Sequence, residues 1–429
     1  MGRLFLLAGA MYGLLLIGLA TLNGGLLALA LPLIVYLGAA LLYAPDVPRL
    51  QVTRTLSAER VRPAAEVEVK LTIRNESAQL EEVLLEDLVP ASVTVRAGRP
   101  GKVVVLSPGQ SVELTYTVAG PRGYHQFQAL RVTAADHLGL FRRQVTLPAP
   151  GGFLVLPEVG RLRQVAIRPL RTRASAGLIA ARVGGPGVDF FGVREYQYGD
   201  SLRWVNWHAT ARHPRHIFTN EFEQERIADV GLILDARQRH DLWSAGDSLF
   251  EHAVRATAAL ADTFLRAGNR VALLSYGAGL TWVFPGYGHI QRERILQALG
   301  RAQTGESDIF ETLEYLPTRL FPAHSQIVLV SPLCPDDLRT LIRLRAHGYE
   351  VLVISPDPIA FESKGLAADR HTAMAVRLAR LERTILLRRL RQAGIQVVDW
   401  AVDRPLDEAV LVSLGRSPRW ARPVMSIQG

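Results

Sequence analysis

The hydrophobic and polar positions along the chain first separate an N-terminal segment without charge. Two runs, Leu4 to Ala20 and Leu26 to Ala44, carry no charged side chain. Each approaches or reaches the ~17 to 25 residues that a helix needs to cross the core of a bilayer. The connector from Thr21 to Gly25 is uncharged and rich in turn-forming residues. The pattern therefore predicts a two-helix transmembrane hairpin over residues 1–48.

Residues 49–150 follow a different pattern, in which apolar and polar side chains alternate in short runs. Val67 to Ile73 and Val112 to Val118 are two examples. A period of two is typical of strands with one buried face. Turn-forming residues such as those at 107–109 separate the runs at the spacing of a small β-sandwich. We therefore expect an all-β sandwich domain.

Residues 151–229 begin with little periodicity and with many Gly, Pro and Arg residues, so we interpret this segment as a linker followed by a signature segment. Arginines occur in it without an intervening acid: Arg161, Arg163, Arg168, Arg171 and Arg173. A solvated linker explains them most simply. A strip attracted to anionic lipid headgroups is the alternative.

From Val230 the pattern changes to near-continuous apolar runs, for example Val230 to Leu234 and Ile327 to Val330. Such runs are typical of parallel strands that are covered on both faces. Helical stretches separate them, and the arginine-rich stretch from Arg377 to Arg391 suits an amphipathic helix that covers the sheet. We expect an α/β doubly wound domain over residues 230–429, with any ligand beside the carboxyl ends of its strands.

Charge and cysteine content narrow the location and the partners. Net charge is +9 at pH 7, which favours acidic partners, and we expect no nucleic acid among them. Arg3 precedes the first apolar run, while Arg49 and Arg54 follow the second. Basic flanks stay on the cytoplasmic side, so the sequence predicts an inner or plasma membrane protein with cytoplasmic domains. The single cysteine, Cys334, excludes an intramolecular disulfide and fits a reducing compartment.

A cleaved signal peptide over residues 1–20 is the alternative to the first span, because small residues end that segment. The second run would then stop transfer with its basic flank inside. The soluble domains would face the cytoplasm in either case.

A dense motif ends the third segment. The string from Gly187 to Trp207, with Ala209 to Arg212 after it, contains the elements Arg-Glu-Tyr, Gly-Asp, Arg-Trp and Ala-Arg. This string resembles the signature of the domain of unknown function 58 family. The resemblance implies a von Willebrand factor A-like domain. It also implies a role as an adaptor that acts with a MoxR-type AAA+ ATPase in chaperone-like assembly or maturation.

The candidate partner-binding residues are Arg194, Glu195, Tyr196, Gly199, Asp200, Arg203, Trp207, Arg212, Asp235, Arg237 and Arg239. The arginines of the motif can each make forked hydrogen bonds to a carboxylate, and Glu195 and Asp200 are the nearest acids. A structural ion-pair network, with Trp204 or Trp207 supplying buried area, is the alternative to direct partner binding.

The resemblance also implies a magnesium site, since von Willebrand factor A-like domains carry Asp-x-Ser-x-Ser after the first strand. Here that place reads Asp235-Ala236-Arg237-Gln238-Arg239. A guanidinium has no acceptor and repels a cation. The strand that should end in Ser-Asp reads Val330-Ser331-Pro332-Leu333, so a second expected carboxylate is missing as well. Thr304, Ser307 and Thr312 stay open as the distant threonine.

We therefore expect a degenerate site with Asp235 as its only clear remnant, no cofactor, and magnesium only as a less favoured alternative. In one alternative, Arg237 or Arg239 captures an acidic residue of a partner. In the other, one of them pairs internally with Asp235.

Catalytic chemistry finds little support in the residues. The chain has no GxxxxGK[ST] motif and no strand-linked GxGxxG, so nucleotide binding has no local basis. Cys334 has no histidine partner that the sequence identifies, so nucleophilic catalysis is not expected. The predicted function is a non-enzymatic, membrane-anchored adaptor. A scaffold in cell-envelope or secretion assembly is the alternative, and an unrecognised hydrolase is less favoured.

Overall fold

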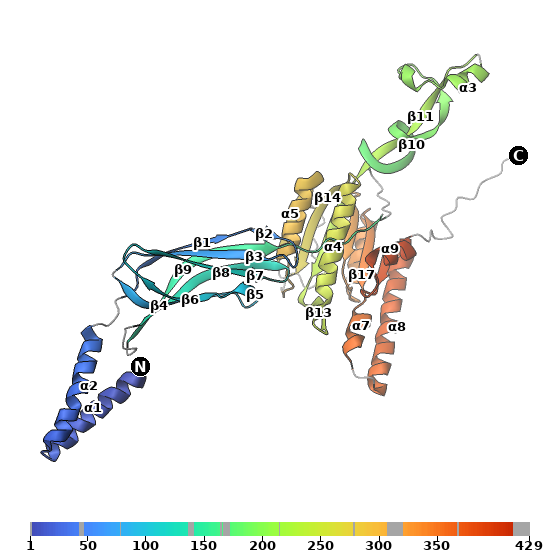
Figure 1. The fold of residues 1–429 in the computed structure, drawn as a ribbon. Coiled ribbons are helices and arrows are strands. Elements are labelled where there is room, and N and C mark those ends of the chain that lie inside the picture. The colour runs from blue at the N-terminus through green and yellow to red at the C-terminus, as the bar shows by residue number, and fades with distance from the viewer. Residues whose placement is uncertain are drawn as a thin grey trace. The chain divides into compact units, whose positions relative to one another are not determined.

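In the computed structural model, two compact units divide the chain, Met1–Leu156 and Pro157–Gly429. The structure describes residues 2–42, 47–77, 79–135, 141–163, 165, 172–213, 215–277, 279–306, 321–366 and 369–414. Helices and strands are labelled in Figure 1.

The first unit begins with two apolar helices, α1 (Gly2–Ala20) and α2 (Gly24–Leu42). Thr21 and Leu22 make the turn between them, and the side chain of Asn23 accepts a hydrogen bond from the backbone of Gly25. By length and composition α2 can cross a membrane, while α1 contains a shorter apolar stretch, Phe5–Ala20. The two predicted apolar runs are therefore helical, and one of them meets the length of a span.

The rest of the first unit is built from strands. One sheet has the order β1-β3-β7-β5 and the other the order β2-β9-β8-β4-β6. The strands are β1 (Leu50–Leu56), β2 (Arg60–Val61), β3 (Val67–Asn75), β4 (Leu80–Asp87), β5 (Thr94–Gly98), β6 (Gly101–Leu106), β7 (Ser111–Ala119), β8 (Gly123–Ala135) and β9 (Arg142–Val155). Alternate residues of β3, from Val67 to Ile73, are buried, as their period of two predicts. They share one apolar core with residues of the second sheet such as Leu85, Val132 and Phe153.

An arginine is buried in this core. Arg54 donates to Asp87 at 2.5 Å, and Tyr116 donates to the other oxygen of the same carboxylate. The guanidinium carbon of Arg54 lies 4.5 Å from the centre of the Phe127 ring. Arg54 therefore belongs to the β-rich core and is not a basic flank of the apolar helices, which corrects one premise of the predicted orientation.

The expected linker begins later and holds more structure than its composition indicates. Strand β9 continues through Val155, and β10 (Thr172–Glu195) pairs antiparallel with β11 (Phe218–Ala236). Four register shifts interrupt this pairing. Such shifts break the alternation of side chains, which explains why the sequence shows no strand period there. Of the basic strip, Arg168 and Arg171 lie outside the described residues.

The second unit carries a mixed sheet with the order β15-β14-β11-β16-β17-β18, which β10 joins through β11. Its further strands are β14 (Arg270–Gly277), β15 (Leu280–Gly286), β16 (Gln326–Val330), β17 (Glu350–Pro356) and β18 (Gln396–Trp400). The pairings β14-β11, β11-β16, β16-β17 and β17-β18 are parallel, and β15 is antiparallel to β14. Every residue of β16 is buried, as its continuous apolar run predicts. The two short strands β12 (Trp243–Ser244) and β13 (Asp247–Ser248) form a separate pair.

Helices cover this sheet. They are α4 (Leu249–Arg266), α5 (Gly288–Arg301), α6 (Asp337–Ala346), α7 (Pro358–Glu362), α8 (Arg370–Gln392) and α9 (Leu406–Leu414), with a short α3 (Trp207–Arg212) between β10 and β11. Leu341 of α6 and Leu387 of α8 share a core with Ile233 and Val353 of the sheet. Helix α4 packs against β11 and β14, and its N-terminus is capped by Ser248. The result is an α/β domain with a mostly parallel sheet.

Candidate functional site

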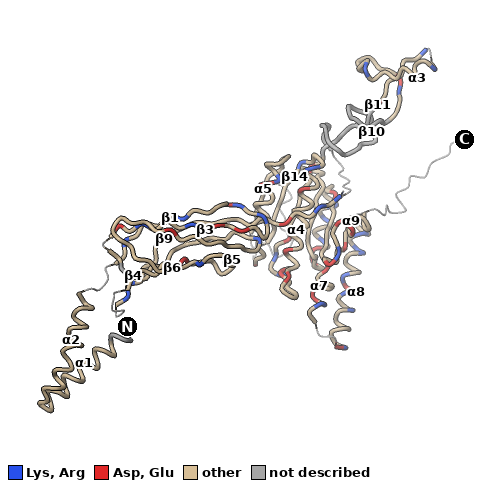
Figure 2. The backbone as a smooth tube through the Cα atoms, in the orientation of Figure 1, with Lys and Arg blue, Asp and Glu red and all other residues tan. Residues whose placement is uncertain are grey.

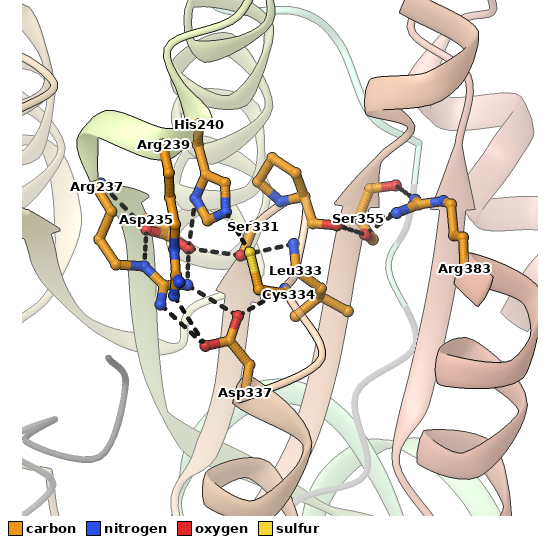
Figure 3. A network of polar contacts seen from close by, with 11 residues as sticks. Asp235, Arg237, Arg239, His240, Ser331, Leu333, Cys334, Asp337, Ser355 and Arg383 are labelled. Atoms are coloured by element: carbon orange, nitrogen blue, oxygen red, sulfur yellow. Dashed lines mark hydrogen bonds and ion pairs between the residues drawn. The ribbon is translucent and has the colours of Figure 1, made fainter. Parts of the chain in front are cut away.

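The order of the strands marks one place on the sheet. From β11 the chain continues to β14 on one side, and β16 lies on the other side. In open α/β sheets, ligands bind beside the carboxyl ends of strands at such a reversal. Here these ends are Asp235 of β11 and Val330 of β16, and polar side chains converge beside them (Figure 3).

Arg237 lies between two carboxylates at this edge. Its Nε and Nη2 donate to the two oxygens of Asp235 at 2.8 and 2.6 Å. Its Nη1 and Nη2 donate to the two oxygens of Asp337 at 2.9 Å each. Forked pairing of this kind is the strongest arrangement for a guanidinium and a carboxylate. Arg237 therefore fastens the end of β11 to the first residue of α6.

The three side chains are almost completely buried, with exposures of 1% for Asp235, 3% for Arg237 and 1% for Asp337. Burial alone would raise the pKa of Asp235, but His240 and Arg237 hold this pKa well below its usual range. Burial alone would lower the pKa of Arg237, but Asp235 and Asp337 keep it above its usual value. The pairing is thus favourable enough to keep buried groups charged.

His240 is a second cation of this cluster. Its Nδ1 lies 2.9 Å from Asp235 Oδ2, within the distance of an ion pair. Burial disfavours the imidazolium, but the charge of Asp235 outweighs it and raises the pKa of His240 to about 9. Two buried carboxylates therefore face two buried cations at neutral pH, Arg237 and His240.

The loop after β16 donates further hydrogen bonds to the carboxylates of Asp235 and Asp337. Ser331 Oγ donates to Asp235 Oδ2 at 2.6 Å, and the backbone N–H of Cys334 donates to Asp337 Oδ2 at 2.9 Å. Leu333 adopts a φ of 66° and donates its N–H to Ser331 Oγ. Since a positive φ is costly for leucine, the surrounding contacts must hold this turn in place.

Arg383 of α8 fixes the same loop from its other side. Its Nη1 donates to the carbonyl of Pro332 at 2.9 Å, and its Nη2 donates to Ser355 Oγ at 3.1 Å and to Asp399 at 2.7 Å. Ser355 Oγ in turn donates to Pro332 O at 3.2 Å. Figure 3 shows the two arginines on opposite sides of the loop. Together they position Asp337.

The residues present do not fit the magnesium ion that the family resemblance implies. A cation there would need the oxygens of Asp235 and Asp337 as ligands. Arg237 already occupies both carboxylates and brings a positive charge in place of the ion. Among the residues that the structure describes, no group of three or more His, Cys, Asp or Glu is arranged to hold a metal. Ser307 and Thr312, two candidates for the distant threonine, lie outside the described residues.

Two statements drawn from the sequence need correction. Asp235 is not the only carboxylate of the site, because the loop after β16 turns back and brings Asp337 to it. Cys334 does have a histidine neighbour, since its Sγ lies 3.5 Å from His240 Nε2. Both contacts join residues about a hundred positions apart in the chain, so local spacing does not reveal them. The only sequence signal was the acidic pair that begins α6, Asp336 and Asp337.

The signature residues lie elsewhere, at the end of β10 and in the segment between β10 and β11. Arg194 donates to both oxygens of Asp200 at 2.8 Å and lies 3.4 Å from Glu221. The carboxylate of Asp200 also accepts from the backbone of Gln197, and Tyr196 donates its hydroxyl hydrogen to the carbonyl of Asp200. These hydrogen bonds raise the pKa of Arg194 and lower that of Asp200. The motif thus pairs within itself, as the structural alternative proposes.

Other signature residues face outward. Arg203 and Arg212 are exposed, and Trp207 is 68% exposed, so it supplies little buried area. Glu195 pairs with His216 at 3.2 Å, and Gly199 adopts a φ of 108°, which favours glycine. Arg239 belongs to the other group but is also partly exposed, at 31% for its side chain, and it lies 3.6 Å from Asp337. Strand β11 begins beside the signature and ends at Ala236, directly after Asp235.

Comparison with known proteins places part of the chain in a family. Residues 192–380 match the family described as "Protein of unknown function DUF58". "Uncharacterized protein YeaD" of Bacillus subtilis (strain 168) is 25% identical over 252 residues, which cover 58% of this chain and 60% of that protein. "Uncharacterized protein Rv1480" of Mycobacterium tuberculosis (strain ATCC 25618 / H37Rv) is 28% identical over 179 residues, 40% of this chain and 56% of the relative. The matches thus span less than two thirds of these relatives.

Solved structures are similar only at a distance. The CARDB domain of the PF1109 protein from Pyrococcus furiosus is 14% identical, with a TM-score of 0.19, and the match covers 26% of this chain and 92% of that domain. Proximal thread matrix protein 1 from the mussel byssus is 16% identical, with a TM-score of 0.23, and covers 30% of this chain and 37% of its own. With TM-scores this low, the fold of each unit rests on its own strand order and register.

Proposed function

Residues 192–380 belong to the DUF58 family, and we propose that the chain is a membrane-anchored interaction protein without catalytic activity of its own. The observation that carries this proposal is the forked bridge from Arg237 to Asp235 and Asp337. It fills the place where a ligand or a metal would bind on such a sheet. The carboxyl edge of the sheet is then a preformed protein surface rather than a reaction centre.

The second unit is a doubly wound domain of the von Willebrand factor A-like kind. Numbered in chain order from β11, the strands of its sheet run 3-2-1-4-5-6, with β15 as an antiparallel edge strand. This is one of the two common orders of doubly wound sheets. The two sheets of the first unit, which share one apolar core, form a β-sandwich.

The apolar helices α1 and α2 form a hairpin that spans the membrane twice. The apolar composition of both and the length of α2 support this. With Arg54 buried in the β-rich core, Arg3 and Arg49 remain as basic flanks, and they favour cytoplasmic soluble domains. Protease digestion of right-side-out and inverted membrane vesicles tests the orientation. Cleavage of the soluble domains in inverted vesicles alone is expected, and cleavage only in right-side-out vesicles would refute it.

The partner docks at the carboxyl edge of the sheet through positive charge that is not taken up by the bridge between Arg237 and its two carboxylates. The guanidinium of Arg237 is paired with Asp235 and Asp337, whereas Arg239 lies 3.6 Å from Asp337 and stays partly exposed. Its remaining donors are suited to an acidic side chain of a partner. Since no metal takes part, a chelator should leave the complex intact.

The partner we propose is a MoxR-type AAA+ ATPase, with the complex acting in chaperone-like assembly or maturation. Affinity purification of the full chain from native membranes in mild detergent, with and without EDTA, tests this. We expect an AAA+ ATPase in both eluates, and less of it with Arg239→Glu. Arg294→Glu on α5 is the matched control, because it makes the same change of charge at another exposed arginine. Purification without any ATPase would favour a scaffold in cell-envelope or secretion assembly instead.

One observation favours an enzyme as the second candidate. Asp235, His240 and Cys334 stand in the order of a nucleophile activated by an oriented base, at 2.9 and 3.5 Å. His240 is only 4% exposed, however, and the nearby described pocket is lined from Pro335 onward and not by Cys334. Turnover of a model ester by the purified chain, lost in Cys334→Ser, would establish this candidate against the binding role.

A further inference from the structure

Helix α8 presents an apolar row to solvent on the face that turns away from the sheet. Its inner face is buried through Arg383, Leu387 and Leu390. The outer face carries large apolar side chains that are exposed by 74, 59, 57 and 44%, namely Met374, Leu378, Leu381 and Ile385. Exposed apolar side chains gathered in one row mark an interaction site more often than scattered ones do.

The spacing of this row is that of a helix-to-helix seam. Its members follow one another at intervals of four, three and four residues, which is the a and d repeat of a coiled coil. On a helix of 3.6 residues per turn, these positions fall within a narrow stripe. Helices that lie on a membrane or on a core show a wider apolar face, whereas a strict a and d stripe is typical of pairing with one other helix.

Positive charge borders the seam. Arg377 and Arg388 fall on one flank, and Arg389 falls on the other, next to Glu382. All four are exposed, and within the part of the chain that the structure describes the side chains of the three arginines have no hydrogen bond or ion pair. Figure 2 shows basic positions repeated along α8. A second copy of α8 would set these arginines against each other, and like charges across an interface are costly.

We propose that the row formed by Met374, Leu378, Leu381 and Ile385 binds an acidic amphipathic helix of another protein, whose carboxylates pair with Arg377, Arg388 and Arg389. The apolar seam supplies the affinity and the flanking charges select an acidic partner. The surface is built from α8 alone, so the inference holds whether or not the edge at Asp235 docks an ATPase.

The test uses the full chain in neutral detergent and a fluorescent synthetic helix with Leu at a and d positions and Glu at e and g positions. Fluorescence anisotropy should show binding, weakened on the order of tenfold or more by Leu378→Asn with Leu381→Asn. Arg377→Glu with Arg388→Glu should weaken it as well, and a probe with Lys in place of Glu should not bind. Ile342→Asn on α6, at another exposed apolar residue, is the matched control and should bind as the wild type does.

Several results would overturn the proposal. They are no binding of the acidic probe, equal binding by the Leu378→Asn with Leu381→Asn variant, or equal binding of the Lys probe. Hydrogen exchange of α8 in nanodiscs shows whether a lipid surface or a second copy of the chain covers the row instead. Protection that phosphatidylglycerol produces without the probe would assign the row to a lipid surface. Protection that rises with protein concentration and is lost in the same variant would assign it to a second copy.

Discussion

A buried arginine lies in each unit, and the two arginines are satisfied very differently. Arg237 reaches both oxygens of two carboxylates, and its pKa lies above the usual value. Among the residues that the structure describes, Arg54 pairs with Asp87 alone, and its Nε and Nη1 are buried without a hydrogen-bond partner there. Burial lowers the pKa of Arg54 and raises that of Asp87. The same kind of pair is therefore well satisfied in one unit and a costly core contact in the other.

The difference lies in the number of partners rather than in burial. A buried ion pair stabilises a fold only when the geometry is good and the remaining donors and acceptors are satisfied. In the α/β unit, Ser331 and the backbone of Cys334 complete the two carboxylates. In the β-rich unit, the aromatic ring of Phe127 faces the guanidinium in place of a second acid. Only the first arrangement places a positive charge between two acids, as a bound cation would be placed.

The largest effect is expected from removing the second acid that pairs with Arg237. Asp337→Ala should leave Arg237 paired with Asp235 alone. The two buried cations, His240 and Arg237, would then face a single carboxylate. Breaking a buried pair in this way costs about 3 to 5 kcal/mol. Faster amide hydrogen exchange of β11 and β16 would report the loss. Unchanged exchange would mean that Asp337 contributes no more than an exposed acid.

The β-rich unit should respond less when its pair is replaced as a whole. Asp87→Asn alone leaves the charge of Arg54 buried and should cost about 3 kcal/mol. Adding Arg54→Met should recover most of that loss, to within ~1 kcal/mol of the wild type, because no buried charge remains and the new amide oxygen still accepts from Tyr116. Exchange of β3 and β7 amides in both variants measures this. A double variant as unstable as the single one would show that Arg54 stabilises its core after all.

Alkaline pH should weaken the α/β unit specifically. The folded-state pKa of His240 is raised to about 9, and the pKa of an unfolded histidine is about 6.5. Its contribution is therefore complete below ~6.5 and is lost as pH rises through about 9. With each pKa unit worth about 1.4 kcal/mol, the loss is on the order of 3 kcal/mol. Exchange of β11 amides, corrected for the intrinsic rate, should accelerate over this range in the wild type and not in His240→Gln.

The smallest effect is expected at the signature, where the forked pair of Arg194 and Asp200 lies near the surface. Water screens such pairs, so Arg194→Ala should leave the exchange of β11 and β14 unchanged. If the same variant loses the co-purified ATPase, the signature binds a partner directly. If it keeps the ATPase, the motif serves to fold the hairpin of β10 and β11.

The sequence predicts the parts whose pattern is local. Alternation from Val67 to Ile73 predicts a half-buried strand, and the apolar run of β16 predicts a strand covered on both faces; the structure shows both. Register shifts interrupt the pairing of β10 with β11, so the sequence of β10 shows no regular strand period. The expected alternative that Arg237 pairs internally with Asp235 is what the structure shows.

The rest of the site depends on contacts between distant positions. Arg237 and Asp337 come together only because β11 and β16 are neighbours in the sheet, an arrangement that no local spacing contains. The turn at Leu333 is equally hidden, since its positive φ occurs in a residue that rarely adopts it. Asp235 and its pairing with Arg237 are predicted from the sequence, whereas the contacts of Asp235 with His240 and Ser331 are found only from the fold.

The central claim is that the guanidinium of Arg237 stands in the place of a cation between Asp235 and Asp337. The most direct test is amide hydrogen exchange of β11 and β16 in the full chain, with and without magnesium, for the wild type and for Arg237→Ser. We expect the ion to leave the wild type unchanged and to restore protection in the variant, because two carboxylates and Ser331 then offer oxygen ligands. Protection of the wild type by magnesium, or a variant as well protected as the wild type without any ion, would contradict the claim.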